Sequence, residues 1–436
     1  MKKRILCAFL GATISAAALG QGGTQSGAIS PYSQYGLGML ADQSLGFNRG
    51  MGGTGLAMRQ GTLVNPLNPA SYSAVDSLTM LFDVSLSLQQ TNFKEKGTSV
   101  NARNADFDYA AGLFRIRKNL GVSFGLLPFS SIGYSYNASS YLNNTIGSIT
   151  ENFTGSGGFH QFYVGAGWSP IKPLSIGFNM AYLWGNYSRT ASSTASPTVN
   201  SLSKLYKANV SSYNLSFGIQ WSQPLGQKNN LTLGIVGGIG HKLGADATCD
   251  IVNLNTSTSV SDTTHFVVRN GLELPMSYGI GLAWVHDQKL TVAADVSLQK
   301  WGSLDFPAYD ETKKQYVLQG GLLSDRTRMS VGADYVPAPN HPTNYLKHVH
   351  LRAGVYYATP YYKLNGQDGP KELGLSAGLG LPLLSRHNID GGLRPVLNIS
   401  AQWVHTAASG FITDNTFRIN VGLTFNERWF AKWRIN

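Results

Sequence analysis

Residues 417–425 read FRINVGLTF and alternate strictly between apolar and polar side chains. A period of two places successive side chains on opposite faces of a β-strand. One face of this strand suits lipid and the other a polar interior, which is the pattern of a transmembrane β-barrel. The same alternation occurs at 290–298 and at 328–335. The C-terminal stretch therefore predicts the fold class of a much longer region.

Working back from this stretch, about fourteen such segments can be placed. They lie near residues 78–92, 104–117, 120–137, 157–169, 173–189, 206–223, 230–247, 264–286, 289–302, 327–337, 347–358, 371–382, 394–406 and 415–425. Connections predicted to be short alternate with long ones at 138–156, 190–205, 248–263 and 303–326, and 338–346 is the exception. An even strand number with alternating connections is typical of bacterial single-chain barrels. We predict an all-β fold, a transmembrane antiparallel β-barrel of about 14 strands over residues 78–436.

Composition supports this class. Charged residues make up 13% of the chain, about half the share of soluble domains, whereas aromatics reach 11% and there are 50 glycines. The net charge of +11 is not gathered into a Lys/Arg cluster, so nucleic acid is not an expected partner. Aromatic residues near the predicted strand ends indicate interfacial girdles, the alternative being the ordinary strand preference of aromatics. These residues are Trp168, Trp184, Trp221, Trp284, Trp301, Trp403, Tyr136, Tyr187, Tyr335, Tyr357, Tyr361 and Tyr362.

The N-terminus has the pattern of an export signal. Three basic residues are followed by an apolar run over 5–18 and by small residues up to Gly20. The run is too short to span a bilayer as a helix. We predict a signal peptide over 1–20, cleaved near Gly20, and a location in the outer membrane of a Gram-negative bacterium. Cys249 is then the one cysteine of the mature chain, which excludes an internal disulfide.

Residues 21–77 alternate poorly and are rich in Gly, Ser, Asn and Pro, yet they contain too many apolar residues for a disordered tail. A barrel of fourteen strands has a lumen too wide for wall side chains alone to fill. The sequence therefore predicts that 21–77 form an N-terminal hatch, a plug inside the lumen.

Within this segment, Gly50 to Gly55 read GMGGTG and match the G-x-G-x-x-G fingerprint of dinucleotide-binding loops. The fingerprint requires a preceding strand and a following helix. No strand pattern precedes Gly50, and Pro66 and Pro69 limit any helix that follows. We expect no cofactor here. The chain also has no metal-ligand spacing and no nucleophile motif in a suitable context, so we expect no metal and no enzyme activity.

Three N-terminal stretches carry a family resemblance: SPYSQYGLG (30–38), NRGMGGTG (48–55) and Asn68-Pro69-Ala70. Together with the C-terminal stretch they resemble the FadL-like outer-membrane transporters, in the branch found in Bacteroidota. The resemblance implies a fourteen-stranded barrel with an N-terminal hatch. It also implies that long-chain fatty acids or other hydrophobic molecules bind from outside and leave sideways through the wall. It assigns Asn68, Pro69 and Ala70 to the hatch motif, together with the glycines Gly52, Gly53 and Gly55.

Charged residues on predicted lumen-facing positions are the remaining candidates. They are Arg269, Arg328, Arg352, Arg418, Asp295 and Asp334, with Asp108 placed similarly. They form either a network of paired charges that braces wall and hatch, or include one arginine that anchors a ligand carboxylate. Pro128 lies inside a predicted strand and indicates either a wall kink beside a lateral opening or a bulge.

The sequence favours diffusive, hatch-gated uptake of a hydrophobic molecule, with outer-membrane lipid around the barrel. Two alternatives stay open. A FadL-like barrel can hold secreted proteins as cargo for a secretion system, or the barrel can be a general porin.

Overall fold

The computed structural model describes residues 30–77, 79–95, 97–141, 148–194, 200–339, 344–383 and 395–428. The predicted signal peptide and residues 21–29 of the predicted hatch lie outside these ranges.

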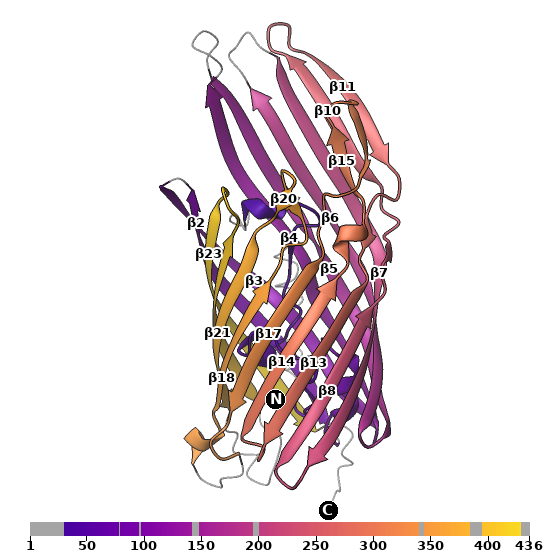
Figure 1. The fold of residues 1–436 in the computed structure, drawn as a ribbon, viewed down its shortest axis with the longest axis vertical. Helices are drawn as coiled ribbons and strands as arrows, with labels where there is room; N and C mark the ends of the chain where they lie inside the picture. The colour runs from indigo at the N-terminus through magenta and orange to yellow at the C-terminus, as the bar shows by residue number, and fades with distance from the viewer. Residues whose placement is uncertain are drawn as a thin grey trace, which may run out of the picture.

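Fourteen of the described strands close into one antiparallel barrel, which confirms the predicted fold class (Figure 1). In wall order they are β2 (Thr79–Glu95), β3 (Thr98–Arg117), β4 (Leu120–Tyr141), β5 (Ser148–Ile171), β6 (Leu174–Thr194), β7 (Ser201–Leu225), β8 (Asn229–Gly238), β13 (Ser277–His286), β14 (Leu290–Gln299), β17 (Arg326–Tyr335), β18 (His350–Ala358), β21 (Lys371–Pro382), β22 (Val396–Ala407) and β23 (Thr413–Arg428). Pairing of β2 with β23, with Phe82 opposite Phe425, closes the ring.

The wall is much taller on one side. Strands β4 to β7 contain 22, 24, 21 and 25 residues, whereas β8, β13, β14 and β17 contain 10 each. A hairpin of β10 (Ala247–Asn255) and β11 (Val260–Val268) extends the sheet beside the upper part of β7 (Figure 1). The prediction of long loops at 138–156, 190–205 and 248–263 is therefore largely wrong. The strands continue past the apolar band, where their outward side chains turn polar and the amphipathic signal ends.

Small two-stranded sheets occupy the connections at this upper rim. They are β9 (His241–Lys242) with β12 (Glu273–Leu274), β15 (Phe306–Asp310) with β16 (Gln315–Gln319), and β19 (Lys363–Leu364) with β20 (Gln367–Asp368). Two short 3₁₀ helices also lie in connections: η3 (Trp301–Ser303) between β14 and β15, and η4 (Tyr345–His348) between β17 and β18. In the described parts of the chain, no helix is long and apolar enough to cross a membrane.

Outward aromatic residues mark two levels on the wall. On β7, Tyr213 and Trp221 are both exposed and span nine residues, the length of a tilted transmembrane strand. Trp168, Trp284 and Tyr335 are also exposed. Four predicted girdle residues instead point inward and are buried, so this part of the girdle prediction is wrong: Trp301, Tyr187, Tyr361 and Tyr362. Alternation alone does not tell which face of a strand meets lipid.

The segment before β2 lies inside the ring of strands (Figure 1). It contains η1 (Pro31–Gln34), β1 (Met39–Leu40), α2 (Gly46–Arg49) and η2 (Pro69–Ala74). We call residues 30–43 the upper stretch and residues 44–77 the ring stretch. The two attach to the wall in different ways.

Candidate functional site: the barrel interior

The ring stretch is seated on a band of glycines in the wall. A Cβ atom on Gly218 would lie 2.0 Å from Oδ1 of Asn68, and one on Gly177 would lie 2.4 Å from the carbonyl carbon of Pro69. Only glycine lets two backbones approach this closely. Nine inward-facing glycines on nine strands contact the segment in this way: Gly121, Gly167, Gly177, Gly218, Gly234, Gly281, Gly332, Gly354 and Gly378.

The ring stretch follows this band around the barrel. Gly50 lies against β21, Met51 against β17 and β18, and Leu56 against β8 and β13. Asn68 then meets β7, and Pro69 meets β6 and β5. Because the chain visits the strands in reverse order before it becomes β2, the ring stretch makes almost one complete turn inside the wall.

The Asn68-Pro69-Ala70 motif fastens this turn. The Asn68 side chain is fully buried, and its Oδ1 accepts a hydrogen bond from the N–H of Ala70 at 3.1 Å, capping η2. Its Nδ2 donates to the carbonyl of Leu56 at 2.7 Å and to that of Ile219 on β7 at 3.3 Å. One amide thus joins two parts of the ring stretch to the wall.

The GMGGTG loop does bind an anion, and the anion belongs to the protein. Oδ2 of Asp295, a buried residue of β14, accepts hydrogen bonds from the N–H groups of Gly55 (2.6 Å) and Leu56 (2.9 Å). Successive backbone N–H groups form the kind of concavity that binds phosphate elsewhere. The turn itself places Gly52 and Gly53 at φ of 70° and 78°. The loop resembles a cofactor motif because it holds a carboxylate of the wall.

Two ion pairs, one buried and one partly buried, connect the segment and the wall. Arg49 contacts Asp108 on β3 at 2.5 Å and Asn420 on β23 at 2.8 Å, on both sides of the β2–β23 closure. The Arg328 guanidinium lies 3.5 Å from Asp42. Burial alone would raise the pKa of Asp42, but Arg328 and Arg49 hold it below its usual value.

Three more predicted charges also face the interior. Arg352 pairs with Asp334 at 3.0 Å, and Arg418 donates to Gln89 at 2.8 Å. Arg269 does not belong to this set. It is exposed in the turn after β11, outside the fourteen wall strands, because the segment predicted over 264–286 is interrupted between β11 and β13. Sequence reasoning missed Arg49 and Asp42, which lie in a segment without alternation.

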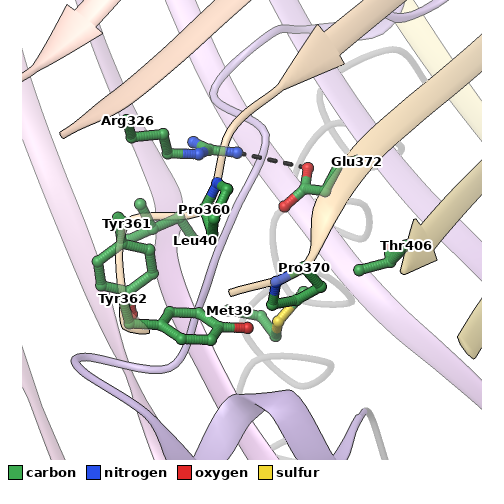
Figure 2. A pocket seen from close by; sticks show the side chains of 9 residues that line it. All are labelled: Met39, Leu40, Arg326, Pro360, Tyr361, Tyr362, Pro370, Glu372 and Thr406. Carbon is green, nitrogen blue, oxygen red and sulfur yellow. Dashed lines mark hydrogen bonds and ion pairs between the residues drawn. The ribbon is translucent and has the colours of Figure 1, made fainter. Parts of the chain in front are cut away.

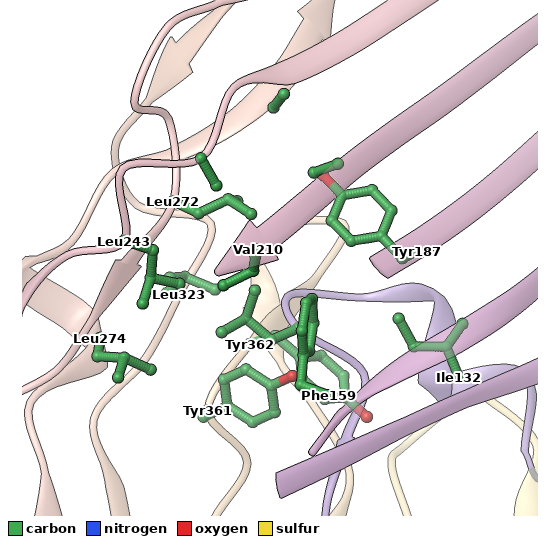
Figure 3. Close-up of a cluster of buried hydrophobic side chains, with 14 of the residues drawn as sticks. Ile132, Phe159, Tyr187, Val210, Leu243, Leu272, Leu274, Leu323, Tyr361 and Tyr362 are labelled. Carbon is green, nitrogen blue, oxygen red and sulfur yellow. The ribbon is translucent and has the colours of Figure 1, made fainter. Parts of the chain in front are cut away.

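Above the ring stretch the interior is filled by apolar and aromatic side chains. Phe159, Tyr187 and Val210 of the tall wall pack against Leu272 and Leu323 from the upper connections (Figure 3). Beside this cluster, Met39 and Leu40 of β1 lie under the Arg326–Glu372 ion pair and near Tyr362 (Figure 2). The cavity lined by these residues has a volume of about 10 Å³, the space of about one water molecule.

The wall is split between β3 and β4. Their pairing runs from Arg117 and Leu120 only as far as Ala110 and Leu126, and the described pairing between the two strands ends there. Pro128 follows directly, at a bulge in the pairing of β4 with β5. Pro128 thus lies at a bulge and at the lower end of the split.

The upper stretch covers the freed edge of β4. Residues Met39 and Leu40 pair with Ser131 and Ser130, although β3 would occupy this edge in a continuous wall. Ala41 N–H donates to the carbonyl of Phe129 at 2.9 Å, and Gln43 Nε2 to that of Pro128 at 2.7 Å. Further up, Ser33 Oγ accepts from Gly133 N–H at 3.1 Å, and Tyr136 OH donates to Gln34 at 2.9 Å. The N-terminal segment satisfies backbone groups that the split leaves open.

A fourteen-stranded barrel with its N-terminal segment inside defines the class: the fold is that of FadL-like barrels. It matches a FadL homologue of Pseudomonas aeruginosa (TM-score 0.64, 10% identity, covering 90% of this chain and 99% of that one). It also matches the toluene transporters TbuX of Ralstonia pickettii (0.59, 13%, 88% and 98%) and TodX of P. putida (0.59, 14%, 88% and 98%). The BamG family model matches residues 1–436, and the chain belongs to the BamG family. No curated protein matches it by sequence.

Proposed function

We propose that this protein is an outer-membrane barrel through which a hydrophobic molecule diffuses, with the N-terminal segment as its hatch. The observation that carries the proposal is the split between β3 and β4, covered from inside by the upper stretch. The similar structures described as toluene transporters and as a FadL homologue support a hydrophobic cargo. A signal peptide over 1–20 would direct the chain out of the cytoplasm and into the periplasm, from which the barrel reaches the outer membrane.

The split lies at the level of lipid. Leu88 on β2 and Phe162 on β5, to either side of it, are 62% and 44% exposed on the outer face. An open groove of about 540 Å³, lined by Leu126, Phe162, Tyr182 and Trp184, lies beside its lower end. If the upper stretch leaves the edge of β4, the interior opens sideways onto an apolar surface. A cargo leaving there never crosses the ring stretch.

Arg189 on β6 offers a binding site for a polar end of the cargo. It is buried among the aromatic side chains of the upper interior, 4.4 Å from the Tyr187 ring, and Nη2 donates to the carbonyl of Gly36 at 2.6 Å. Its Nε has no hydrogen-bond partner, and no carboxylate of the described residues forms an ion pair with it. A buried cation without a counter-charge is costly. A carboxylate would compensate it, which favours an anionic amphiphile such as a long-chain fatty acid.

Two paired variants test this function. Leu40→Cys/Ser130→Cys would cross-link the upper stretch to β4, since residues opposite in register have suitable Cα spacing. Ser73→Cys/Ser175→Cys, whose native hydroxyls are 3.0 Å apart, would cross-link the ring stretch to β6 as the control. Oxidation should stop uptake of labelled fatty acid only in the first variant, and a reductant should restore it. Uptake that continues with the upper stretch cross-linked contradicts the proposed exit.

Arg189→Gln tests the polar end. We expect fatty-acid binding to weaken at least about tenfold, roughly the value of one charge-assisted contact, with little effect on toluene. Arg418→Gln is the matched control because Arg418 already has Gln89 as its partner. Equal losses for fatty acid and toluene would contradict the carboxylate role.

A second candidate is the holding of secreted cargo proteins. The observation that favours it is the tall side of the wall, where β11 pairs with β10 and has no further strand pairing among the described residues. Such an edge can add a further strand from another chain. Co-purification of secreted proteins that is lost when 247–268 are deleted would support this role. A general porin is disfavoured because the described interior is packed.

A further inference from the structure

We infer that the ring stretch is a permanent internal brace of the barrel, and that the glycine band is the surface built to receive it. This role is independent of any cargo. It concerns how the wall stays closed rather than what passes through it.

The first support is the cost of the band to the wall. Glycine inside a strand loses more conformational entropy than other residues and offers no side chain to pack, so each one weakens the sheet. Here Gly121, Gly167, Gly177 and Gly218 lie opposite one another on four successive strands. A wall of this kind is weak at that level unless another element packs on it.

The second support is that the ring stretch occupies this level. The carbonyl oxygen of Tyr72 lies where a Cβ of Gly121 would lie, within 2.0 Å, and that of Leu56 lies equally close to Gly234. On β14, the strand between β13 and β17, Asp295 replaces glycine and binds the segment through its carboxylate. Around the tall side and the short side alike, the wall residue at this level is suited to the backbone of the segment.

The third support is at the closure of the barrel. The first and last wall strands meet at β2 and β23, and here side chains replace glycines. Arg49 joins Asp108 on β3 to Asn420 on β23, and Gln402 on β22 donates to the carbonyl of Arg49 at 3.1 Å. The Tyr109 hydroxyl accepts from Gly46 N–H at 2.5 Å and donates to Asp83 on β2 at 3.0 Å. The ring stretch therefore ties together strands on both sides of the closure.

The test uses the full-length protein in detergent. Gly177→Ala and Gly218→Ala place a methyl group against the ring stretch. Gly237→Ala on β8 is the control, because a Cβ there meets only one atom, at 3.9 Å. We expect each band variant to lower the midpoint of thermal unfolding by roughly 3 °C or more and the control to leave it unchanged. We also expect trypsin to cleave after Arg49, which is 3% exposed in the native fold, only in the band variants.

A double variant separates loss of the brace from local damage to a strand. Asn68→Ala removes the atom that Gly218→Ala would strike. In Gly218→Ala/Asn68→Ala the two losses should be less than additive, since both act on one contact. The inference is overturned if the band variants behave as Gly237→Ala does. It is overturned equally if the midpoint falls while Arg49 stays protected, or if the two losses simply add.

Discussion

The upper stretch and the ring stretch belong to one continuous segment, yet they are held by opposite means. The ring stretch contacts strands around almost the whole wall, through backbone packing on glycine and through buried charge. The backbone of the upper stretch pairs with the edge of a single strand, β4, and its other contacts are individual side-chain interactions, such as those of Arg189 with the carbonyl of Gly36 and of Arg328 with Asp42. An element packed against strands all round the wall cannot leave without disturbing the barrel, whereas one whose backbone pairs with a single edge has only that pairing and individual side-chain contacts to break. If the upper stretch acts as the hatch that we propose, this difference lets it move while the wall stays closed.

The largest expected effect on stability is at the closure of the barrel, where Arg49 of the ring stretch lies. Arg49→Met leaves Asp108 buried without its partner, and breaking a buried ion pair in this way costs about 3–5 kcal/mol. The unfolding free energy, measured in urea, should fall by that order. Arg49→Met/Asp108→Leu should lose less than the single variant, because no uncompensated charge is left. If Arg49→Met were as stable as the native protein, the Arg49–Asp108 ion pair would not be part of what holds the ring stretch.

Asp295→Asn should come next. The amide keeps an acceptor oxygen for Gly55 and Leu56 but loses the charge that strengthens both hydrogen bonds, so we expect a loss of about 1–3 kcal/mol. Asp262→Asn, at an exposed position of β11, is the control and should change stability little. Equal effects at the two positions would show that the N–H groups do not depend on a carboxylate.

Ser33→Ala addresses the upper stretch alone. It removes the acceptor of the Gly133 N–H, which should cost about 1 kcal/mol. Amide hydrogen exchange should accelerate over 30–43 and stay slow over 44–77. Acceleration in both stretches would mean that they open together, against the division drawn here.

The smallest effect should be the pH dependence of the stability of the upper stretch near Asp42, where this stretch meets the ring stretch. Because its folded pKa is held below the unfolded value near 3.9, the carboxylate stabilises the fold above about pH 4. This stabilisation is lost as the pH falls through the folded pKa. The protection of the amides over 30–43, measured relative to the intrinsic exchange rate at each pH, should therefore fall on acidification below about pH 4. In Asp42→Asn the protection should already be lower at neutral pH and should vary less with pH; a pH profile of protection like that of the native protein would exclude Asp42 as the group responsible.

Much of the wall could be predicted from the sequence. All fourteen segments correspond to strands, since a face that meets lipid imposes strict alternation, as in residues 417–425. The hairpin at 247–268 and the upper ends of β4 to β7 were missed because strands outside lipid lack that constraint. Within the predicted site, Asn68 and Asp295 both hydrogen-bond to the backbone of Leu56. Arg269 instead lies outside the fourteen wall strands.

The contacts that organise the barrel interior left weaker signals in the sequence. Arg189 occupies a polar position in the alternating pattern of its strand, as its polar neighbours do. Nothing in that pattern shows that its side chain lies among aromatic side chains. The glycine band did leave a trace: glycine recurs at inward positions of consecutive strands, as at Gly167, Gly177 and Gly218. Such a row is recognisable only once the strand register is known, because the residues are adjacent in the wall and not in the chain.

The contacts of Arg49 and its neighbours also have a consequence for the order of folding. Arg49 and Asn420 are 371 residues apart in sequence, and Gly50 and Ser376 are 326 apart. Contacts of such high sequence separation form late, because the chain must first be brought together over its whole length. The beginning of the segment can settle only when the last strands have joined. We therefore expect a slow final phase in refolding, in which an already β-rich chain acquires protection at Arg49.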